Sequence, residues 1–442
     1  MSTNIASPRS TGLERDARLS TTDHGETVAP GEIAIGVIIG RTSEFFDFFV
    51  YAIASVLVFP QIVFPFVNRL DGTLYAFALF SLAFIARPIG SVIFMAVDRN
   101  YGRGVKLTVA LFLLGGSTAA MAFLPRYSEV GAASIVFLAV ARFAQGIALG
   151  GAWDGLASLL TLNAPEGKRG WYAMMPQLGA PLGLLLACAL FAFFAFNLNS
   201  ADFLDWGWRY PFFVAFAVNV VALFARLRLV VTNEFANLLE SRDLEPTRVG
   251  EMFKSEGMNV LLGAFAPLAS FAMFHLVTVF PLSWVSIYRN RDTSEFLQLE
   301  MAGAFVAIAT IAASGVLADK IGRRKALGWS AGAIAVFSFF APFLLGGGKI
   351  GEAAFMLIGF GVFGLSFGQA SGAVASNFSK RFRYTGSALT SDLAWLIGAG
   401  FAPLIVLAIT SKFGLVSIGG YLLSGAICTL VALRINRTLA NR

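Results

Sequence analysis

Long apolar stretches recur along this 442-residue chain from residue 33 to residue 433, and short polar loops separate them. Each stretch is long enough for an α-helix that crosses a bilayer, which takes about 20 apolar residues. The pattern predicts an all-α membrane protein with twelve transmembrane helices. The expected spans are residues 33–60, 73–97, 105–124, 131–162, 171–196, 207–229, 258–288, 297–318, 326–346, 351–378, 386–411 and 413–433.

A polar, charged stretch at 230–257 divides these spans into two sets of six. We therefore expect an N-terminal six-helix bundle at 31–229, a cytoplasmic linker at 230–257 and a C-terminal six-helix bundle at 258–433. Residues 1–30 are polar and mixed in charge, which predicts a cytosolic tail and no signal peptide. A second cytosolic tail is expected at 434–442.

The composition agrees with a protein whose outer surface faces hydrocarbon. Hydrophobic residues make up 57% of the chain and charged residues 13%, whereas soluble domains average about 25% charged residues. The two cysteines, Cys188 and Cys428, each lie inside an apolar run, and the chain has only two histidines. These counts argue against a disulfide framework and a metal site, and we expect no cofactor.

The net charge of +7 comes largely from Lys and Arg in alternate loops. Such residues mark the cytoplasmic side of a membrane protein. The chain is therefore expected in a bacterial cytoplasmic (inner) membrane, with both termini on the cytoplasmic side. Lipid is the expected surrounding partner, and no nucleic-acid partner is expected. The basic loop residues on that side include Arg99, Arg103, Lys106, Lys168, Arg169, Lys320, Arg323, Arg324, Lys325, Lys380, Arg381 and Arg383.

A repeated loop supports two related halves. Asp98 to Arg103 follow the second expected helix, and Asp319 to Lys325 follow the eighth, each with an acid ahead of Gly and Arg. The acid lies four residues before Gly102 in the first loop and three before Gly322 in the second. Parallel six-helix repeats with this relationship are known in secondary transporters.

The loop from Gly315 to Arg324 fits the pattern G-x-x-x-D-[RK]-x-G-R-[RK], and further segments follow in the order of one family. The chain resembles the major facilitator superfamily and, within it, the metabolite:proton symporter family. Ala152 and Ser376 stand where that family has Glu, so the chain resembles an outlying member. The other matching segments are 40–51, 86–90, 142–146, 176–179, 208–212, 383–386 and 400–404.

The resemblance implies two pseudo-symmetric six-helix bundles and a secondary active transporter, not an enzyme. It would move a small polar metabolite by proton symport with alternating access, as a monomer. Arg41 and Arg142 within the spans favour an organic anion. Uncoupled facilitation, export, and a transporter-like membrane sensor remain as alternatives. No cluster of catalytic residues or filter-like segment indicates a membrane enzyme or a channel.

Arg41, Glu44, Asp47 and Tyr51 recur every three or four residues in the first span, so they share one helix face. Ionised groups in a membrane helix normally face a cavity or a partner. We expect this face to line the central cavity, with Glu44 or Asp47 taking up the proton. The alternative is an internal Arg41–Glu44 pair that only holds the helix.

Arg142 and Gln145 share a face of the fourth span. The resemblance implies that Arg142 takes part in proton movement, because a nearby cation changes the proton affinity of an acid. A purely structural bridge to an acid of the first helix is equally open. Arg87, ahead of Pro88, is expected to cap or anchor a loop.

Two further acids are candidates for proton coupling: Asp154 in the fourth span, which can equally contact the loops, and Asp392, the only acid in the eleventh span, where an unpaired acid would be costly. Asp98, Arg103, Asp319, Gly322 and Arg323 are expected to form gating loops that make and break contacts. The remaining substrate-cavity candidates are Gln177, His275, Thr278, Gln369 and Asn377.

Overall fold

The computed structural model describes residues 30–152, 155–162, 164–230, 245–289, 291–370 and 378–435. Within these ranges every regular element is a helix, so the all-α prediction is confirmed. Two candidate site residues, Asp154 and Asn377, lie outside the described residues. So do residues 1–29, 231–244 and 436–442, which hold most of the expected tails and linker.

The first half of the chain contains six long helices joined by short helical turns. The long helices are α2 (Pro30–Leu57), α4 (Arg69–Tyr101), α5 (Arg103–Ala122), α7 (Ala133–Gly151), α10 (Gly179–Asn197) and α12 (Arg209–Val230). The short ones are α3 (Phe59–Ile62), α6 (Tyr127–Val130), α8 (Leu156–Leu162), α9 (Arg169–Met174), η1 (Met175–Leu178), α11 (Ser200–Asp202) and η2 (Phe203–Gly207).

The second half has long helices of the same kind, two of which are interrupted. Its elements are α14 (Val249–Phe265), α15 (Leu268–Thr278), α16 (Phe280–Tyr288), α17 (Thr293–Ile321), α18 (Arg323–Gly346), α19 (Gly348–Phe367), η3 (Lys380–Phe382), α21 (Arg383–Trp395), η4 (Leu396–Gly400), α22 (Ala402–Phe413) and α23 (Val416–Ile435).

The helices have the length and surface of membrane spans. In the described part of the chain 11 helical stretches are long and apolar enough to cross a bilayer. The helix α2 is not among these 11 stretches, although it has 28 residues and is long enough to span a bilayer. It differs from them in its charged side chains, which include Arg41, Glu44 and Asp47. Counted with α2, the described ranges contain twelve spans. Large apolar side chains such as Phe112 and Phe343 are exposed on the outside.

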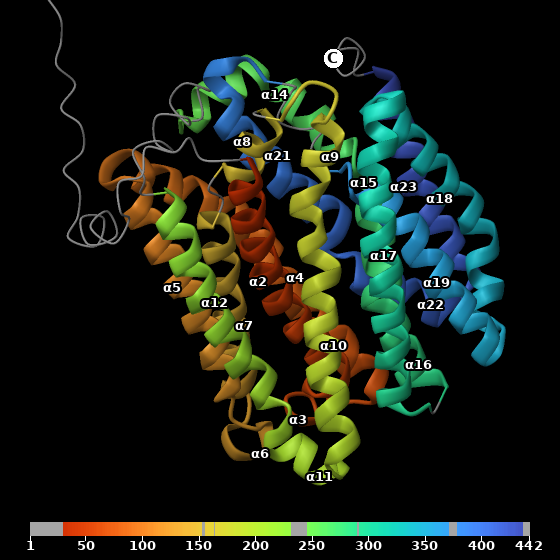
Figure 1. The fold of residues 1–442 in the computed structure, drawn as a ribbon. Helices are drawn as coiled ribbons and strands as arrows, with labels where there is room; N and C mark the ends of the chain where they lie inside the picture. Colours follow the sequence, from red (N-terminus) through yellow and green to blue (C-terminus); the bar gives the residue numbers. More distant parts are fainter. Residues whose placement is uncertain are drawn as a thin grey trace, which may run out of the picture.

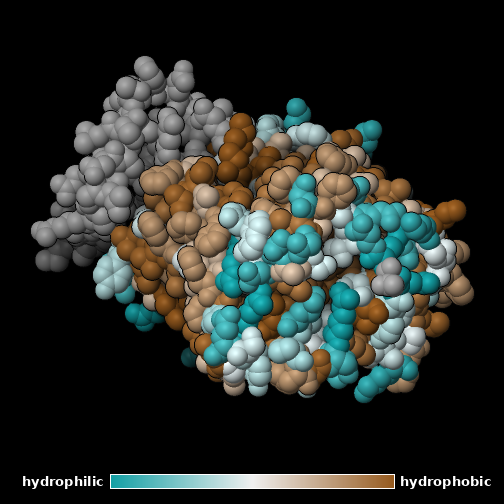
Figure 2. Space-filling view, turned by 90° about the horizontal axis from the view of Figure 1, so that it is seen from below, coloured by the Kyte–Doolittle hydropathy of each residue, from teal (hydrophilic) through white to brown (hydrophobic). Residues whose placement is uncertain are grey.

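The polar and apolar surfaces are segregated as a membrane protein requires. Figure 2 looks onto the end of the molecule at which α3, α6, α11 and α16 lie. Hydrophilic residues gather on that end, and hydrophobic residues surround it. Hydrocarbon cannot hydrogen-bond polar groups, so the flank is apolar and the polar residues are left to the ends.

The two sets of helices lie side by side (Figure 1). α10 packs against α17, α4 packs against α21, η4 and α22, and α2 packs against α16, so each contact joins the first half to the second. The first and last described residues both lie at the end of the molecule that carries α9 and α14 (Figure 1).

The repeated loops have the same backbone geometry in both halves. Gly102 (φ 89°) separates α4 from α5, and Gly322 (φ 86°) separates α17 from α18. Each glycine N–H donates to a carbonyl four residues back, at Asp98 or Ala318, with a length of 3.0 Å. A positive φ is readily adopted by glycine alone, so a glycine in each loop allows one sharp turn.

Three expected spans are interrupted in the structure. The stretch 258–288 is divided by Pro267 and Pro281 into α14, α15 and α16, and 386–411 is divided by η4. Proline lacks the N–H that continues a helix, which explains the breaks at 267 and 281. α14 also begins at Val249, inside the expected linker, and bends at Glu256 (φ −131°). The stretch 131–162 is divided after Gly151.

Candidate functional site

Glu44 on α2 is shared by two arginines. Arg41 Nη1 lies 2.7 Å from Glu44 Oε2, and Arg226 Nη2 on α12 lies 2.6 Å from Glu44 Oε1. Gly40 makes room for Arg226, since a Cβ at this position would lie 2.1 Å from Arg226 Nε. The Arg41–Glu44 pair, which the sequence offered as one alternative, is therefore present. The second cation, Arg226, was not predicted from the sequence.

Asp47, one helical turn further along α2, has polar partners of a different kind. It accepts hydrogen bonds from the hydroxyl of Thr118 on α5 and from Gln145 Nε2 on α7. Arg142 donates to Gln145 Oε1, so Gln145 links Arg142 to Asp47. No ion pair joins Asp47 to a cation among the described residues, and its side chain is buried.

Arg142 is fully buried between two aromatic rings. Its guanidinium carbon lies 4.1 Å from the ring centre of Tyr51 and 4.7 Å from that of Phe80. Nε donates to the Phe80 carbonyl at 3.2 Å. Within the described chain, Arg142 Nη2 and the Tyr51 hydroxyl have no hydrogen-bond partner. A buried polar group without a partner is costly, so these atoms are ready to bind a polar ligand.

Arg87 and Asp392 form an ion pair between the halves. Arg87 Nε on α4 lies 2.7 Å from Asp392 Oδ1 on α21, and Ser91 donates to Asp392 Oδ2. Asp392 thus has a cation as its partner, and the expectation that Arg87 caps or anchors a loop is wrong. Helix periodicity places both residues on helices, but only the packing of α4 against α21 brings them together.

A small cavity lies between these polar groups. Its volume is about 30 Å³, which holds about one water molecule. Arginines outnumber acids in its lining, which consists of Arg41, Glu44, Phe45, Phe48, Ala83, Phe84, Arg87, Arg142, Leu149 and Trp395. We call this lining, together with Asp47, Gln145 and Arg226, the central polar cluster.

His275 on α15 lies in an aromatic environment beside the cluster. Its ring centre is 5.7 Å from those of Phe48 and Phe80 and 5.0 Å from that of Phe274. Neither ring nitrogen has a hydrogen-bond partner in the described residues. Thr278 is also buried, but it donates to the Phe274 carbonyl and so has its bond within α15. Gln177 on η1 is buried, and its Oε1 has no hydrogen-bond partner in the part of the chain that the structure describes.

Asp319, Gly322 and Arg323, where α17 meets α18, lie beside the start of α9. Asp319 accepts hydrogen bonds from the backbone N–H of Gly170 at 2.6 Å and of Trp171 at 3.1 Å. These residues open α9, where a carboxylate satisfies free N–H groups. Gln369, an expected cavity residue, also lies here and donates to the Gly170 carbonyl at 3.1 Å.

Asp98 contacts the second half at Tyr384 on α21, because the Tyr384 hydroxyl donates to Asp98 Oδ2 at 3.4 Å. Its Oδ2 lies 3.8 Å from Arg103 Nε and 3.5 Å from Lys106 Nζ. Lys106 is almost fully buried and donates to the hydroxyl of Tyr384 on α21 at 2.6 Å. Lys106 and Tyr384 did not appear among the site candidates, although an ionisable residue near a predicted span is itself a signal.

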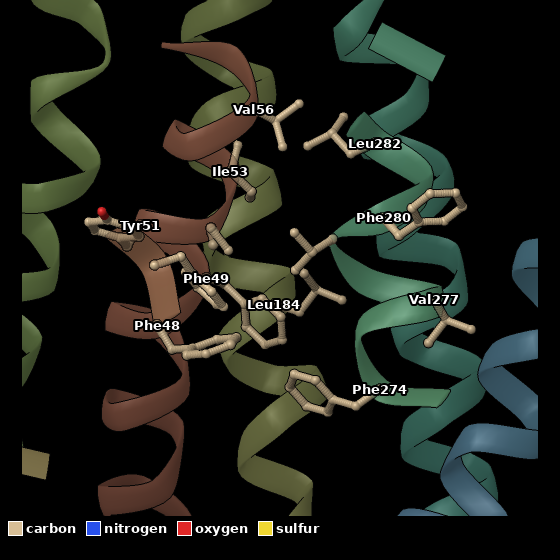
Figure 3. Close-up of a cluster of buried hydrophobic side chains, with 14 of the residues drawn as sticks. Phe48, Phe49, Tyr51, Ile53, Val56, Leu184, Phe274, Val277, Phe280 and Leu282 are labelled. Carbon is tan, nitrogen blue, oxygen red and sulfur yellow. The ribbon is translucent and has the colours of Figure 1, made fainter. Parts of the chain in front are cut away.

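The opposite end of the interface is closed by apolar side chains. Val56 on α2 and Leu282 on α16 face one another, and Phe49 and Phe274 meet further in (Figure 3). The rings of Phe49 and Phe274 are stacked, with centres 5.6 Å apart. Arg69 on α4 also donates to Ser286 on α16. The two halves therefore contact each other at both ends of their interface.

A family model described as Major Facilitator Superfamily matches residues 42–403. The chain belongs to this superfamily. It is 34% identical over 427 residues to the inner membrane metabolite transport protein YhjE of Escherichia coli (strain K12), covering 94% of this chain and 97% of that protein. It is 28% identical over 409 residues to the shikimate transporter of the same organism, covering 89% and 91%.

A solved structure of a D-xylose-proton symporter has the same fold. It matches with a TM-score of 0.69 and 18% identity, covering 92% of this chain and 97% of that chain. The twelve-helix major facilitator fold and the family resemblance found in the sequence are thereby confirmed. Since these relatives are transporters, this protein is a multi-pass membrane transporter of metabolites and not an enzyme.

Proposed function

We propose that this transporter carries a small organic anion together with a proton by alternating access. The observation that carries the proposal is the central polar cluster, in which Arg41, Arg87 and Arg142 line one cavity with Glu44 as the acid. Arg142 Nη2 and both nitrogens of His275 are buried without a partner in the described chain. Arg142 Nη2 and the one N–H of a neutral His275 ring offer hydrogen-bond donors to an anionic substrate.

The choice of an anion follows from charge. Asp392 neutralises Arg87, and Glu44 is shared by Arg41 and Arg226, so Arg142 is the cation of the lining that no acid of the described residues contacts directly. A carboxylate beside Arg142 would supply the missing charge. The relative named as a shikimate transporter is consistent with a carboxylate substrate.

The proton site that fits best is Asp47. A buried carboxylate without a cation is destabilised, and binding a proton removes its charge. Glu44 fits this role less well, because two arginines hold its charged form. Since Gln145 links Arg142 to Asp47, a substrate that binds Arg142 changes the field at Asp47 and so couples the two events.

The ends of the interface supply the gates in this proposal. Asp319, Gly322 and Arg323 with the start of α9, and Asp98 and Arg103 with α21, would open together on the cytoplasmic side. The two halves would then rock about the central polar cluster.

We place both termini and the linker in the cytoplasm of an inner membrane protein that acts as a monomer. Labelling of Glu245→Cys from outside intact cells would contradict this orientation.

Transport by purified protein in liposomes tests the proposal. Organic acids, shikimate included, are first screened for a rise in the melting temperature of the protein. The best acid is then offered to liposomes with an inward proton gradient, with and without a protonophore. Accumulation above the outside concentration that is lost with the protonophore supports symport. Equilibration without accumulation indicates facilitation, and accumulation only with an outward proton gradient indicates export by antiport.

A further inference from the structure

Another buried acid, outside the central polar cluster, lies in the contact between the two halves. Glu300 on α17 is fully buried. Cys188 on α10, which is also fully buried, donates its S–H to Glu300 Oε2 at 3.3 Å. Glu300 Oε1 has no hydrogen-bond partner in the described residues. We call the interface of α10 with α17 the seam.

No cation balances Glu300. α10 contains no charged residue, and no ion pair of Glu300 is found within the described chain. The other charged residues of α17 and of the helices that pack on it lie toward the helix ends. They are Glu295, Asp319 and Lys320 on α17, Lys349 and Glu352 on α19, Arg323, Arg324 and Lys325 on α18, and Arg169 on α9.

The acids among those charges, and Lys349, have partners of their own. Glu352 pairs with Arg291, Lys349 pairs with Glu295, and Asp319 binds the start of α9. Cys188 is therefore the titratable group that faces Glu300 across the seam. One S–H donor compensates poorly for an ionised carboxylate, which needs a cation or several strong donors to be buried.

We propose that Glu300 is a proton-binding site that governs opening of the seam. In the closed seam the carboxyl group keeps its proton and is buried neutral. When α10 and α17 separate, water reaches Glu300, its O–H bond breaks, and the proton passes to water while the electron pair stays on the carboxylate. The charged carboxylate holds the seam open until it regains a proton, because burying it uncompensated is costly.

This site is separate from the one proposed for coupling. Asp47 lies on α2 and is hydrogen-bonded to Thr118 and Gln145, all within the first half. Glu300 lies in the second half and contacts α10 of the first half. The inference rests on the transporter fold and on burial at the seam. It holds whether or not transport is proton-coupled, so a failed symport assay leaves it unaffected.

Infrared spectroscopy of the wild type and Glu300→Gln tests the protonation directly. The expected result is a C=O stretching band of a protonated carboxylic acid at neutral pH that disappears in the variant. Cys188→Ala should shift this band to higher frequency without removing it, because a hydrogen bond to the carboxyl is lost. Absence of a band that depends on Glu300 overturns the proposal.

Hydrogen exchange of peptides containing Cys188 and Glu300 tests the link to opening. An opening step that releases one proton becomes up to about tenfold more favourable for each pH unit. After correction for the pH dependence of the intrinsic exchange rate, protection of the seam amides should decrease as the pH rises in the wild type. In Glu300→Gln it should be independent of pH. Glu295→Gln, an exposed acid on the same helix, should behave like the wild type. Equal pH dependence in wild type and Glu300→Gln overturns the role in opening.

Discussion

Arg87 and Asp392, which are 305 residues apart in the sequence, form an ion pair 2.7 Å long between the two halves. Both side chains are nearly buried, and Ser91 supplies a further hydrogen bond to the acid. The pair joins α4 to α21 and so connects Arg87 of the central polar cluster to the second half. It must break or be rearranged when the halves separate along this face.

Loss of one member of this pair should destabilise the protein strongly. Arg87→Gln and Asp392→Asn each leave a buried charge without its partner, which costs about 3–5 kcal/mol. The double variant Arg87→Leu/Asp392→Leu should recover much of that loss. Chemical unfolding in detergent measures the change. Arg381→Gln, which breaks the exposed pair with Glu251, is the control and should cost at most about 1 kcal/mol. Single variants as stable as the control would contradict the prediction.

Asp47→Asn and Glu44→Gln should affect transport differently. The amide at position 47 keeps hydrogen-bonding capacity but cannot exchange a proton, so uphill accumulation should be lost while exchange of substrate continues. Glu44→Gln leaves Arg41 and Arg226 without their shared acid and should lower stability as well as transport. Accumulation and exchange in liposomes, with unfolding measured in parallel, separate the two effects. Normal accumulation by Asp47→Asn would remove this residue from the coupling mechanism.

Arg142→Gln should weaken substrate binding by about tenfold or more, because a charge-assisted hydrogen bond contributes about 1.5–3 kcal/mol. The shift in melting temperature caused by an organic acid measures the affinity. Arg126→Gln is the control, since Arg126 pairs with Asp205 near α6 and α11, away from the cavity. Equal affinity in the wild type and Arg142→Gln would place the anion elsewhere.

Gly146→Ala should destabilise the contact of α4 with α7. A Cβ at this position would lie 2.3 Å from the Ala83 carbonyl oxygen, which is backbone and cannot move alone. Overpacking of this kind costs about 1–3 kcal/mol. Gly116→Ala on α5 is the matched control, because a Cβ there meets nothing within 4 Å. Thermal unfolding should rank Gly116→Ala at or above the wild type and Gly146→Ala below it.

The sequence was sufficient for the framework of this protein. Each span needs a long apolar stretch, so the spans could be read from the pattern alone, although the breaks at Pro267, Pro281 and η4 were not placed. The repeated turns at Gly102 and Gly322 were also visible, because a local motif dictates a local backbone shape. The spacing of Arg41, Glu44 and Asp47 correctly placed them on one side of a helix, since helical period is a local property.

The tertiary structure alone decided which partner each charged group takes. Periodicity predicts the face of a helix but not the helix that covers it, so Arg226 beside Glu44 and Asp392 beside Arg87 were not foreseen. In a membrane every helix is apolar, and which helices meet depends on close packing at small residues such as Gly90 and Gly146. Glu300 shows the same limit: one acid in an apolar run becomes a buried group without a cation only because α10 packs against α17.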